Sequence, residues 1–526
     1  MPKILAASLC LLALLCAPLA AQDEAHDAAH AAGKATATPQ KPNGQKPADA
    51  DGHEAAKTGG PAAPIGPLPA AATTSHVLEL PGRTLRFTAK AGAIHLSAAQ
   101  SGAPLADVSY VAFLRDDAED VAKRPIVFAL NGGPGASSAW LNLGGLGPWR
   151  LPLEGGAVPP SAAPQLVPNA DTWLDFADLV FIDPPGTGYS RVLTSDDNAK
   201  RHFYSIDGDI ETLAVVIRKW LVENKRLESP KFIVGESYGG FRGPKLARRL
   251  ENDEGIGVRG LVLISPVLDF GWFEGDNNPL VSATRLPSLA AAQRHLDGAD
   301  GRDKLADVEA YAQGPYIEDL LRGPGDAAAQ ARISEKVAEF TGLDAQLVRR
   351  HAGFLDAQMF VRERERATGR VPSLYDALIL GYDGNPQSSS RERADPVLDS
   401  MKVPLASAMA HLTAAQLGWF IDSRYEILNE SVNRQWDWDG RSRAESISDL
   451  KHIMALDPTL RVLVAHGLTD EVTPYFASKL LIAQVPPMGD PGRLRLAVYG
   501  GGHMIYADDR SRAALREDVR KLLEGK

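Results

Sequence analysis

Short apolar runs recur along the chain, separated by segments of helical or loop character. Each run is continuous in apolar residues, which is typical of strands that are buried on both faces of a parallel sheet. Between the runs, apolar residues recur at spacings of three and four, as in 210–225, which predicts helices. Strands that alternate with helices predict a doubly wound α/β sheet. The runs are RPIVFAL (124–130), ADLVFID (177–183), KFIVG (231–235), GLVLIS (260–265), RVLVAH (461–466) and RLAVYG (495–500).

Two further stretches follow different patterns. Apolar and polar residues alternate over 75–116, which predicts antiparallel strands before the parallel ones. The regular alternation of strand and helix stops over 270–458, where helical spacing dominates and Pro and Gly interrupt it. An insertion between sheet strands predicts a mostly helical cap over the carboxyl ends of the strands, where open α/β sheets bind ligands. We therefore expect a core built from 75–269 and 459–526 and a cap built from 270–458.

The N-terminal part differs from the rest. Residues 1–21 begin with a positive charge at Lys3, continue with an apolar run and end in small residues, an order that predicts a secretory signal peptide. Residues 22–74 are rich in Ala, Pro and Gly and poor in large apolar side chains, which predicts a disordered linker. We expect an exported protein, periplasmic or secreted, with no stable membrane span once the signal is removed.

The net charge and the positions of the cysteines exclude several kinds of partner and site. The 526 residues carry a formal net charge of -10, which argues against binding to nucleic acid. The two cysteines, Cys10 and Cys16, both lie in the predicted signal, so the mature chain would have no disulfide, no thiol nucleophile and no cysteine metal site. The histidines are not spaced as metal ligands are, so we expect no metal. The glycine-rich loops lack the following Lys-Ser or Lys-Thr of a nucleotide-binding loop, so we expect no cofactor. The sequence leaves the oligomeric state open.

A nucleophile motif stands at the end of one predicted strand. Gly235-Glu236-Ser237-Tyr238-Gly239 follows KFIVG and precedes a predicted helix, which is the strand–turn–helix setting of a G-x-S-x-G elbow. Such a turn exposes a serine hydroxyl near a helix N-terminus, and its glycines avoid collision with neighbouring backbone. Ser237 is therefore the candidate nucleophile.

Partners for that serine follow other strands. Asp470 comes just after RVLVAH and His503 just after RLAVYG, and the chain order Ser, Asp, His is that of the α/β-hydrolases. In such a triad Ser237 attacks, His503 carries the proton and Asp470 orients the imidazole. His466, at the end of its own strand, is interpreted as structural. Glu471 is a possible substitute for the acid.

A glycine-rich loop follows the first parallel strand. Asn131-Gly132-Gly133-Pro134-Gly135 resembles the oxyanion loop of the α/β-hydrolases, in which backbone N–H groups stabilise the tetrahedral intermediate. A plain strand-to-loop turn is the other interpretation. Together with the elbow, the loop predicts an α/β-hydrolase fold with a mostly parallel, doubly wound sheet and a largely helical cap.

The motifs NGGPGASS, GESYGG, HGLTDEVTP and GGHM together resemble the serine carboxypeptidases, the S10 peptidase family, in a bacterial-type member. A weaker match is DPPGTGYS (183–190). The resemblance implies that Gly133 and Tyr238 form the oxyanion hole through their N–H groups. It also implies that Asn131 and Glu236 bind the C-terminal carboxylate of a peptide substrate, which would be hydrolysed through an acyl-enzyme on Ser237.

One position departs from the family pattern. The family has a second glutamate that shares a proton with the one at the elbow, and its place here is Gly145. Glu236 then lacks a like-charged partner that would raise its pKa. We therefore expect a peptidase that trims C-terminal residues with an altered pH preference. An esterase, amidase or acyltransferase on the same scaffold, a prolyl aminopeptidase-like exopeptidase and a non-catalytic binding protein are the alternatives.

Overall fold

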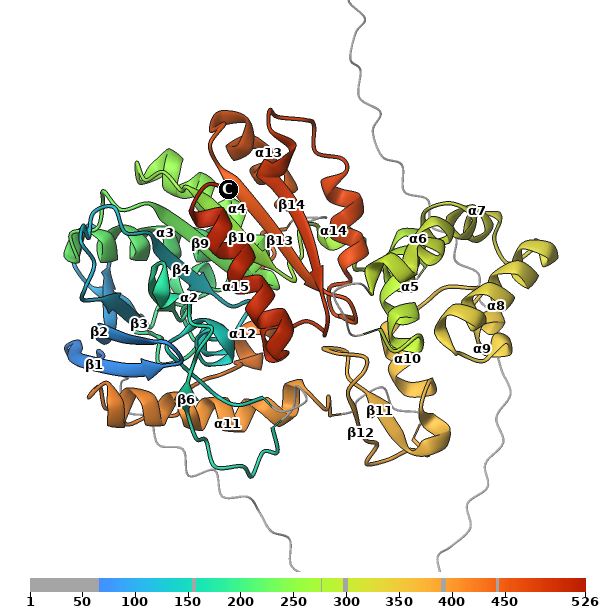
Figure 1. Ribbon diagram of the computed structural model, residues 1–526, viewed down its shortest axis with the longest axis horizontal. Helices are drawn as coiled ribbons and strands as arrows, with labels where there is room; N and C mark the ends of the chain where they lie inside the picture. Colours follow the sequence, from blue (N-terminus) through green and yellow to red (C-terminus); the bar gives the residue numbers. More distant parts are fainter. Residues whose placement is uncertain (1–65, 154–157, 276, 297–300, 389–393, 441–443) are drawn as a thin grey trace, which may run out of the picture. The chain divides into compact units, whose positions relative to one another are not determined.

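The computed structural model describes residues 66–153, 158–275, 277–296, 301–388, 394–440 and 444–526 (Figure 1). The predicted signal peptide and most of the predicted linker lie outside these residues. Strand β1 begins at Ala72, so the end of the predicted linker at residue 74 differs from the structure. The β-branched pair Thr73 and Thr74 is the reason, because both residues extend the antiparallel pairing with β2.

A single large sheet runs through the molecule. The first strands pair antiparallel, β3 pairs antiparallel with β7, and all pairs from β7 to β14 are parallel. The doubly wound, mostly parallel sheet predicted from the sequence is therefore confirmed. Its order is β1 (Ala72–Leu80), β2 (Arg83–Ser97), β3 (Pro104–Arg115), β7 (Asp178–Ile182), β4 (Ile126–Leu130), β9 (Lys231–Glu236), β10 (Gly260–Ile264), β13 (Arg461–Gly467) and β14 (Leu494–Tyr499), with β8 (Arg191–Val192) paired to β3. Two small hairpins stand apart: β5 (Trp149–Arg150) with β6 (Val167–Pro168), and β11 (Arg370–Pro372) with β12 (Leu380–Tyr382).

Alternate residues of the central strands enter different apolar cores. In β4, Ile126 and Phe128 pack with α3, α4 and α13 on one face, whereas Val127 and Ala129 pack with α1, α11 and α15 on the other. This explains why the parallel strands are apolar without a break. The helices are α1 (Ala139–Leu141), α2 (Asp197–Phe203), α3 (Ile206–Glu223), α4 (Tyr238–Asp253), α5 (Pro279–Gln293), α6 (Ala306–Gln313), α7 (Pro315–Arg322), α8 (Ala327–Thr341), α9 (Ala345–Arg350), α10 (Ala357–Glu363), α11 (Leu398–His411), α12 (Glu430–Arg434), α13 (Ile447–Leu456), α14 (Tyr475–Ile482) and α15 (Asp509–Leu523).

The chain between β10 and β13 divides into parts with different packing. Helices α5 to α10 share an apolar core, which Tyr475 and Phe476 of α14 join, and they lie together to one side of the sheet (Figure 1). Helix α13 instead packs on α4 against the sheet, and α11 joins the core on the opposite face. The predicted cap over 270–458 thus differs from the packing, because helical spacing looks the same whether a helix covers a sheet or a neighbouring helix.

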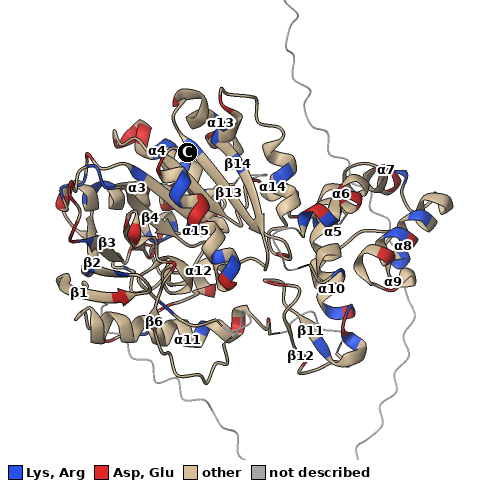
Figure 2. Ribbon diagram, in the orientation of Figure 1, with Lys and Arg blue, Asp and Glu red and all other residues tan. Residues whose placement is uncertain are grey.

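Charged residues are concentrated in the helices and loops, and the central strands are nearly free of them (Figure 2). Strands β4 and β10 contain no charged residue, and β13 has only Arg461 at its start. Within the described ranges, no helix combines the length and the apolar character that a membrane crossing requires.

Trp220 gives a test of the core on the α3 face. Its side chain is fully buried and packs edge-on against Phe128 and Tyr110. Trp220→Ala should lower the free energy of unfolding by roughly 3–5 kcal/mol, because it removes buried area and leaves a cavity. Urea unfolding followed by circular dichroism measures the loss. Val222→Ala, at a 52% exposed position of the same helix, is the matched control and should stay within about 0.5 kcal/mol of wild type.

Candidate active site

The site lies where the strand order reverses. Strand β4 has β7, which follows it in the chain, on one side and β9 on the other. The loops that leave the carboxyl ends of β4 and β9 therefore meet, and such a crevice is where open α/β sheets bind ligands. The first of these loops carries Asn131 and the second carries Ser237.

Ser237 occupies a strained turn between β9 and α4. Its backbone angles are φ 59° and ψ -121°, a conformation that side chains rarely adopt. The turn is packed so closely that a Cβ at Gly235 would lie 2.0 Å from the Gly239 carbonyl oxygen, and one at Gly239 would lie 2.3 Å from that of Leu130. Only glycine fits at these positions, so the geometry agrees with the elbow predicted from the motif.

The glycine-rich loop after β4 lies directly against this turn. A Cβ at Gly132 would be 2.5 Å from the backbone nitrogen of Tyr238, so the loop reaches the N-terminus of α4. The guanidinium of Arg242, in α4, donates to the Asn131 carbonyl oxygen and pairs with Asp209 at 2.6 Å. Arg242 thus links the start of the loop to α3 and α4. Gly133 of the loop lines the same pocket as Ser237, and Tyr238 follows the serine directly in the chain.

Asp470 and His503 are in contact. His503 Nδ1 lies 2.9 Å from Asp470 Oδ2, and both side chains are buried. The other oxygen of Asp470 accepts from the backbone N–H groups of Val472 and Thr473, at 2.8 and 2.9 Å. The Thr473 hydroxyl lies 2.7 Å from Asp470 Oδ2. The carboxylate is therefore held in one orientation toward the imidazole.

These contacts set the ionisation of the pair. Burial by itself raises the pKa of Asp470, but attraction to His503 and the hydrogen bond from its ring outweigh burial, and the pKa lies below its usual value. Burial lowers the pKa of His503, yet attraction to Asp470 outweighs burial and the net pKa is raised. Asp470 is thus ionised and strengthens the basicity of the imidazole.

The backbone of His503 is anchored from two other segments. Its N–H donates to the Tyr375 carbonyl oxygen at 2.6 Å, and its carbonyl oxygen accepts from the Ser265 hydroxyl at 2.8 Å. The Tyr375 ring stands edge-on to the imidazole, with 5.3 Å between the ring centroids. Ser265 directly follows β10, whereas Tyr375 belongs to the insertion, so the insertion helps to position the histidine.

Glu236 is buried beside the serine and has a phenol as its partner. The Tyr506 hydroxyl donates to Glu236 Oε2 at 2.6 Å, and the Asn131 side chain also bonds to the carboxyl group. Burial raises the pKa of Glu236 to about 7, against the opposing influence of His503, Tyr506 and Asn131. Gly145 supplies no like-charged partner, as expected, but the pKa of Glu236 is raised all the same, chiefly by desolvation and to a smaller extent by the charge of Asp470.

Gly145 lies close to that phenol and not in open space. A Cβ at Gly145 would be 2.7 Å from the Cβ of Tyr506, and one at Gly144 would be 2.3 Å from its ring. The space that a side chain would need at Gly145, the predicted place of the family's second glutamate, is thus occupied by the tyrosine side chain. Glycine at this point makes room for the donor that contacts Glu236.

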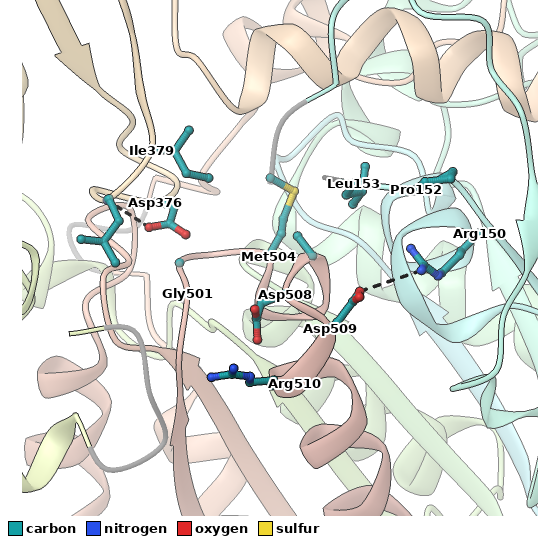
Figure 3. Close-up of a pocket in the computed structure, with 13 residues that line it drawn as sticks. Arg150, Pro152, Leu153, Asp376, Ile379, Gly501, Met504, Asp508, Asp509 and Arg510 are labelled. Carbon is teal, nitrogen blue, oxygen red and sulfur yellow. Dashed lines mark hydrogen bonds and ion pairs between the residues drawn. The ribbon is translucent and has the colours of Figure 1, made fainter. Parts of the chain in front are cut away.

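A small pocket of about 120 Å³ opens over the serine and is lined by Asn131, Gly133, Glu236, Ser237, His503 and Met504, among others. A second cavity, of about 640 Å³, adjoins it at Met504. Figure 3 shows Asp376 on one side of the larger cavity and Arg150 and Asp509 across from it, with Met504 between. Burial raises the pKa of Asp376 to about 6. The larger cavity and the pocket at the serine thus share Met504 in their walls.

The other candidates lie away from the catalytic hydrogen bonds. His466 is buried with Nε2 2.8 Å from the Ser478 hydroxyl, and burial lowers its pKa to about 4, which fits a structural histidine. The Glu471 side chain is buried near Arg285, and burial raises its pKa well above the usual value. In this geometry Asp470, and not Glu471, holds the imidazole.

Sequence reasoning missed Tyr375, Thr473, Ser265 and Tyr506. Tyr506 stands only three residues after His503 in GGHMIY, so its proximity to the site could have been found from the sequence. Thr473 likewise follows Asp470 in the same loop. No local pattern marks Tyr375, which reaches His503 from the insertion by the fold alone.

Residues 106–270 match the family model described as serine carboxypeptidase. Serine carboxypeptidase-like 13 of Arabidopsis thaliana is 30% identical over 150 residues, which are 28% of this chain and 33% of that protein. The pheromone-processing carboxypeptidase kex1 of Pyrenophora tritici-repentis is 34% identical over 126 residues, 24% of this chain and 18% of that protein. The chain therefore spans about a third or less of the length of these curated relatives.

Similarity in structure extends further than similarity in sequence. The crystal structure of a prohormone-processing carboxypeptidase from Saccharomyces cerevisiae superposes with a TM-score of 0.54 and 15% identity, covering 83% of this chain and 91% of that one. At this identity the likeness concerns the fold. The described chain has the α/β-hydrolase fold, and its segment 106–270 is similar in sequence to the serine carboxypeptidase family.

Proposed function

We propose that the protein is a serine-type carboxypeptidase that hydrolyses C-terminal peptide bonds through an acyl-enzyme on Ser237. The observation that carries the proposal is the arrangement around the pocket. A strained serine, an Asp470–His503 pair and the buried side chains of Asn131 and Glu236 converge there. The serine and the pair supply hydrolysis, and Asn131 with Glu236 supplies a reason to prefer a substrate with a free C-terminus.

The residues act in sequence. The hydroxyl of Ser237 attacks the carbonyl carbon of the last peptide bond while His503 accepts its proton. The oxyanion that forms receives hydrogen bonds from the N–H groups of Gly133 and Tyr238. The imidazolium then protonates the leaving amino group, so the terminal amino acid departs and an ester on Ser237 remains. Water, deprotonated by His503, attacks that ester and releases the shortened peptide.

Uncharged hydrogen-bond donors recognise the free C-terminal carboxylate of the substrate. A protonated Glu236 can donate to the substrate carboxylate, whereas an ionised one would repel it. The raised pKa of Glu236, about 7, keeps the protonated form available in mildly acidic solution. The Asn131 side-chain oxygen accepts from the backbone N–H of Leu141 at 3.0 Å, which orients its amide group. An esterase or amidase would have no use for a buried acid at this place.

Export to the periplasm or the medium remains a prediction, because its signal lies outside the described residues. The bacterial-type assignment also remains a prediction. The chemistry above needs a peptide substrate and no other partner.

Cleavage of a peptide with a free C-terminus tests the proposal. Purified protein should release the last amino acid from an N-blocked dipeptide acid, and Ser237→Ala should reduce kcat/KM by at least about 10³-fold, because the nucleophile is lost. Amino acid release is followed by chromatography. Hydrolysis of N-blocked esters or amides without any release from the free acid would contradict the carboxypeptidase and favour the esterase or amidase.

Asp470→Asn tests the orientation of the base. The change keeps the shape of the side chain but removes the charge that raises the pKa of His503, so kcat should fall by roughly 10⁴-fold with the fold intact. Steady-state kinetics and circular dichroism measure the two effects. Glu471→Gln is the control, and a larger loss of kcat from it than from Asp470→Asn would assign the acid to Glu471.

The pH dependence of substrate preference tests Glu236. The ratio of kcat/KM for a free-acid peptide to kcat/KM for an ester without a carboxylate cancels the ionisation of His503. Because the pKa of Glu236 is about 7, this ratio should be constant at lower pH and fall by about tenfold per pH unit above it. Glu236→Gln cannot ionise and should make the ratio independent of pH. A ratio that keeps its fall in Glu236→Gln would show that another group recognises the carboxylate.

A further inference from the structure

A buried tyrosine completes the carboxylate-binding end of the pocket. Tyr506, in the short helical turn Ile505–Ala507 that follows His503, donates its hydroxyl hydrogen to Glu236 Oε2 at 2.6 Å. Burial, followed by the charge of Glu236, raises the pKa of Tyr506 well above its usual value. The phenol therefore keeps its proton, and it acts toward Glu236 as a donor at every physiological pH.

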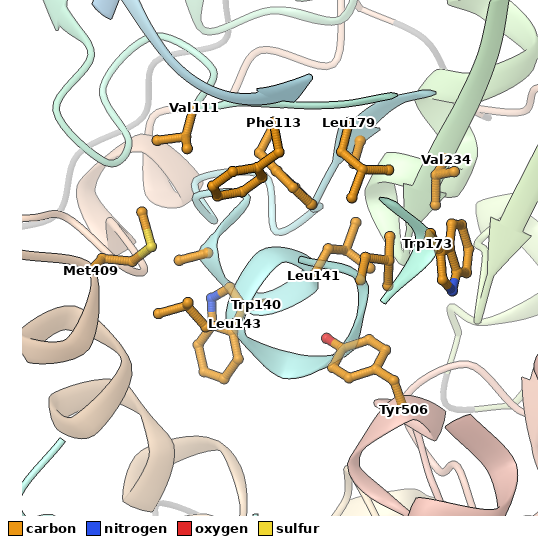
Figure 4. Packing of buried hydrophobic residues seen from close by; sticks show 14 of the residues in the cluster. Val111, Phe113, Trp140, Leu141, Leu143, Trp173, Leu179, Val234, Met409 and Tyr506 are labelled. Carbon is orange, nitrogen blue, oxygen red and sulfur yellow. The ribbon is translucent and has the colours of Figure 1, made fainter. Parts of the chain in front are cut away.

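The packing around the ring fixes the direction of this hydroxyl. Figure 4 shows the Tyr506 ring against the turn that carries Leu141 and Leu143. Gly144 and Gly145 approach the ring and its Cβ so closely that a methyl group on either would collide with the side chain. Behind the ring, the Arg512 guanidinium donates to the Tyr506 carbonyl oxygen at 3.2 Å. The side chain has little freedom to turn away from Glu236.

This geometry determines which oxygen of Glu236 carries the proton. A carboxyl oxygen that accepts a short hydrogen bond from a phenol is the carbonyl oxygen of the neutral acid, so the acidic hydrogen belongs on Oε1. We propose that Tyr506 is a positioning residue for substrate recognition: it holds Oε2 and so directs the proton of Glu236 to Oε1, where it is donated to the C-terminal carboxylate of the peptide. The proposal rests on the proposed function, in which Glu236 binds that carboxylate.

Other groups around Glu236 act on its ionisation without this directional effect. The charge of His503 stabilises the ionised form, and the charge of Asp470 opposes it. Tyr375 from the insertion experiences the charge of Glu236, and Asn131 bonds to its carboxyl group. The Tyr506 hydrogen bond lowers the pKa of Glu236. Its removal should therefore shift the ionisation of Glu236 to higher pH and at the same time weaken carboxylate binding, a combination that simple loss of packing does not produce.

The experiment measures binding in a chain that cannot turn over. Ser237→Ala and Ser237→Ala/Tyr506→Phe are titrated calorimetrically with an N-acetyl dipeptide acid and with its C-terminal amide, from pH 5 to pH 8.5. We expect Tyr506→Phe to weaken binding of the acid by about tenfold, as for loss of a hydrogen bond to a group that binds charge, and to leave binding of the amide unchanged. The pH at which the acid loses affinity should move upward.

A second variant and a control protect the result from effects on folding. Gly145→Ala keeps the phenol but pushes the ring away from Glu236, and it should cause the same acid-specific loss. Tyr475→Phe removes another buried phenol–carboxylate hydrogen bond, 2.8 Å to Glu309 in the insertion, and it should leave the acid-to-amide ratio unchanged.

The outcomes separate the two proposals. Equal weakening of acid and amide by Tyr506→Phe, or no weakening of either, would overturn the positioning role. Absence of Ser237-dependent release from the free-acid peptide by the unaltered enzyme would instead overturn the carboxypeptidase. A preference for the acid over the amide in Ser237→Ala that disappears with Tyr506→Phe supports the positioning role directly.

Discussion

The close approach of two backbone segments governs the site. The turn at 235–239 lies so near the end of β4 and the loop after it that a Cβ at Gly239 would lie 2.3 Å from the Leu130 carbonyl oxygen. This contact places the strained serine, the N-terminus of α4 and the glycine-rich loop within reach of one another. A buried ion pair, Arg242 with Asp209, fixes the same loop from behind, and an uncompensated charge there would be costly. In this part of the molecule, the packing of the core therefore also fixes the positions of the catalytic residues.

Two buried carboxyl groups of the site differ in their ionisation. Asp470 and Glu236 are both fully buried carboxyl groups, yet their pKa values move in opposite directions. Asp470 has an adjacent imidazole and backbone donors, so it is ionised. Glu236 has a phenol and an amide, which compensate desolvation less, so it retains its proton in mildly acidic solution. Neighbouring carboxyl groups thus take different chemical roles because of their hydrogen-bond partners.

The insertion between β10 and β13 contributes residues to the active site as well as to the cavity beside it. Tyr375 accepts from the His503 backbone, and the adjacent Asp376 lines the larger cavity beside the pocket. Helices α5 to α10 share an apolar core that also takes in Tyr475 and Phe476 of α14, so this part packs directly on the second half of the sheet domain. The insertion therefore both positions the histidine and lines the cavity beside the pocket.

The amino-acid sequence was enough to predict the parallel strands, the elbow, and Ser237, Asp470 and His503 as candidates. These features depend on local patterns: continuous apolar runs, glycines at a sharp turn, and polar residues just after strands. It could not determine that α13 packs on α4, because helical spacing does not name the partner of an apolar face. Nor could the sequence give the protonation state of Glu236, since a pKa depends on burial and on neighbours brought from distant segments. Tyr506 illustrates the difference: its place in the chain is next to His503, but only the tertiary structure, through Gly144, Gly145 and the packing around them, aims its hydroxyl at Glu236.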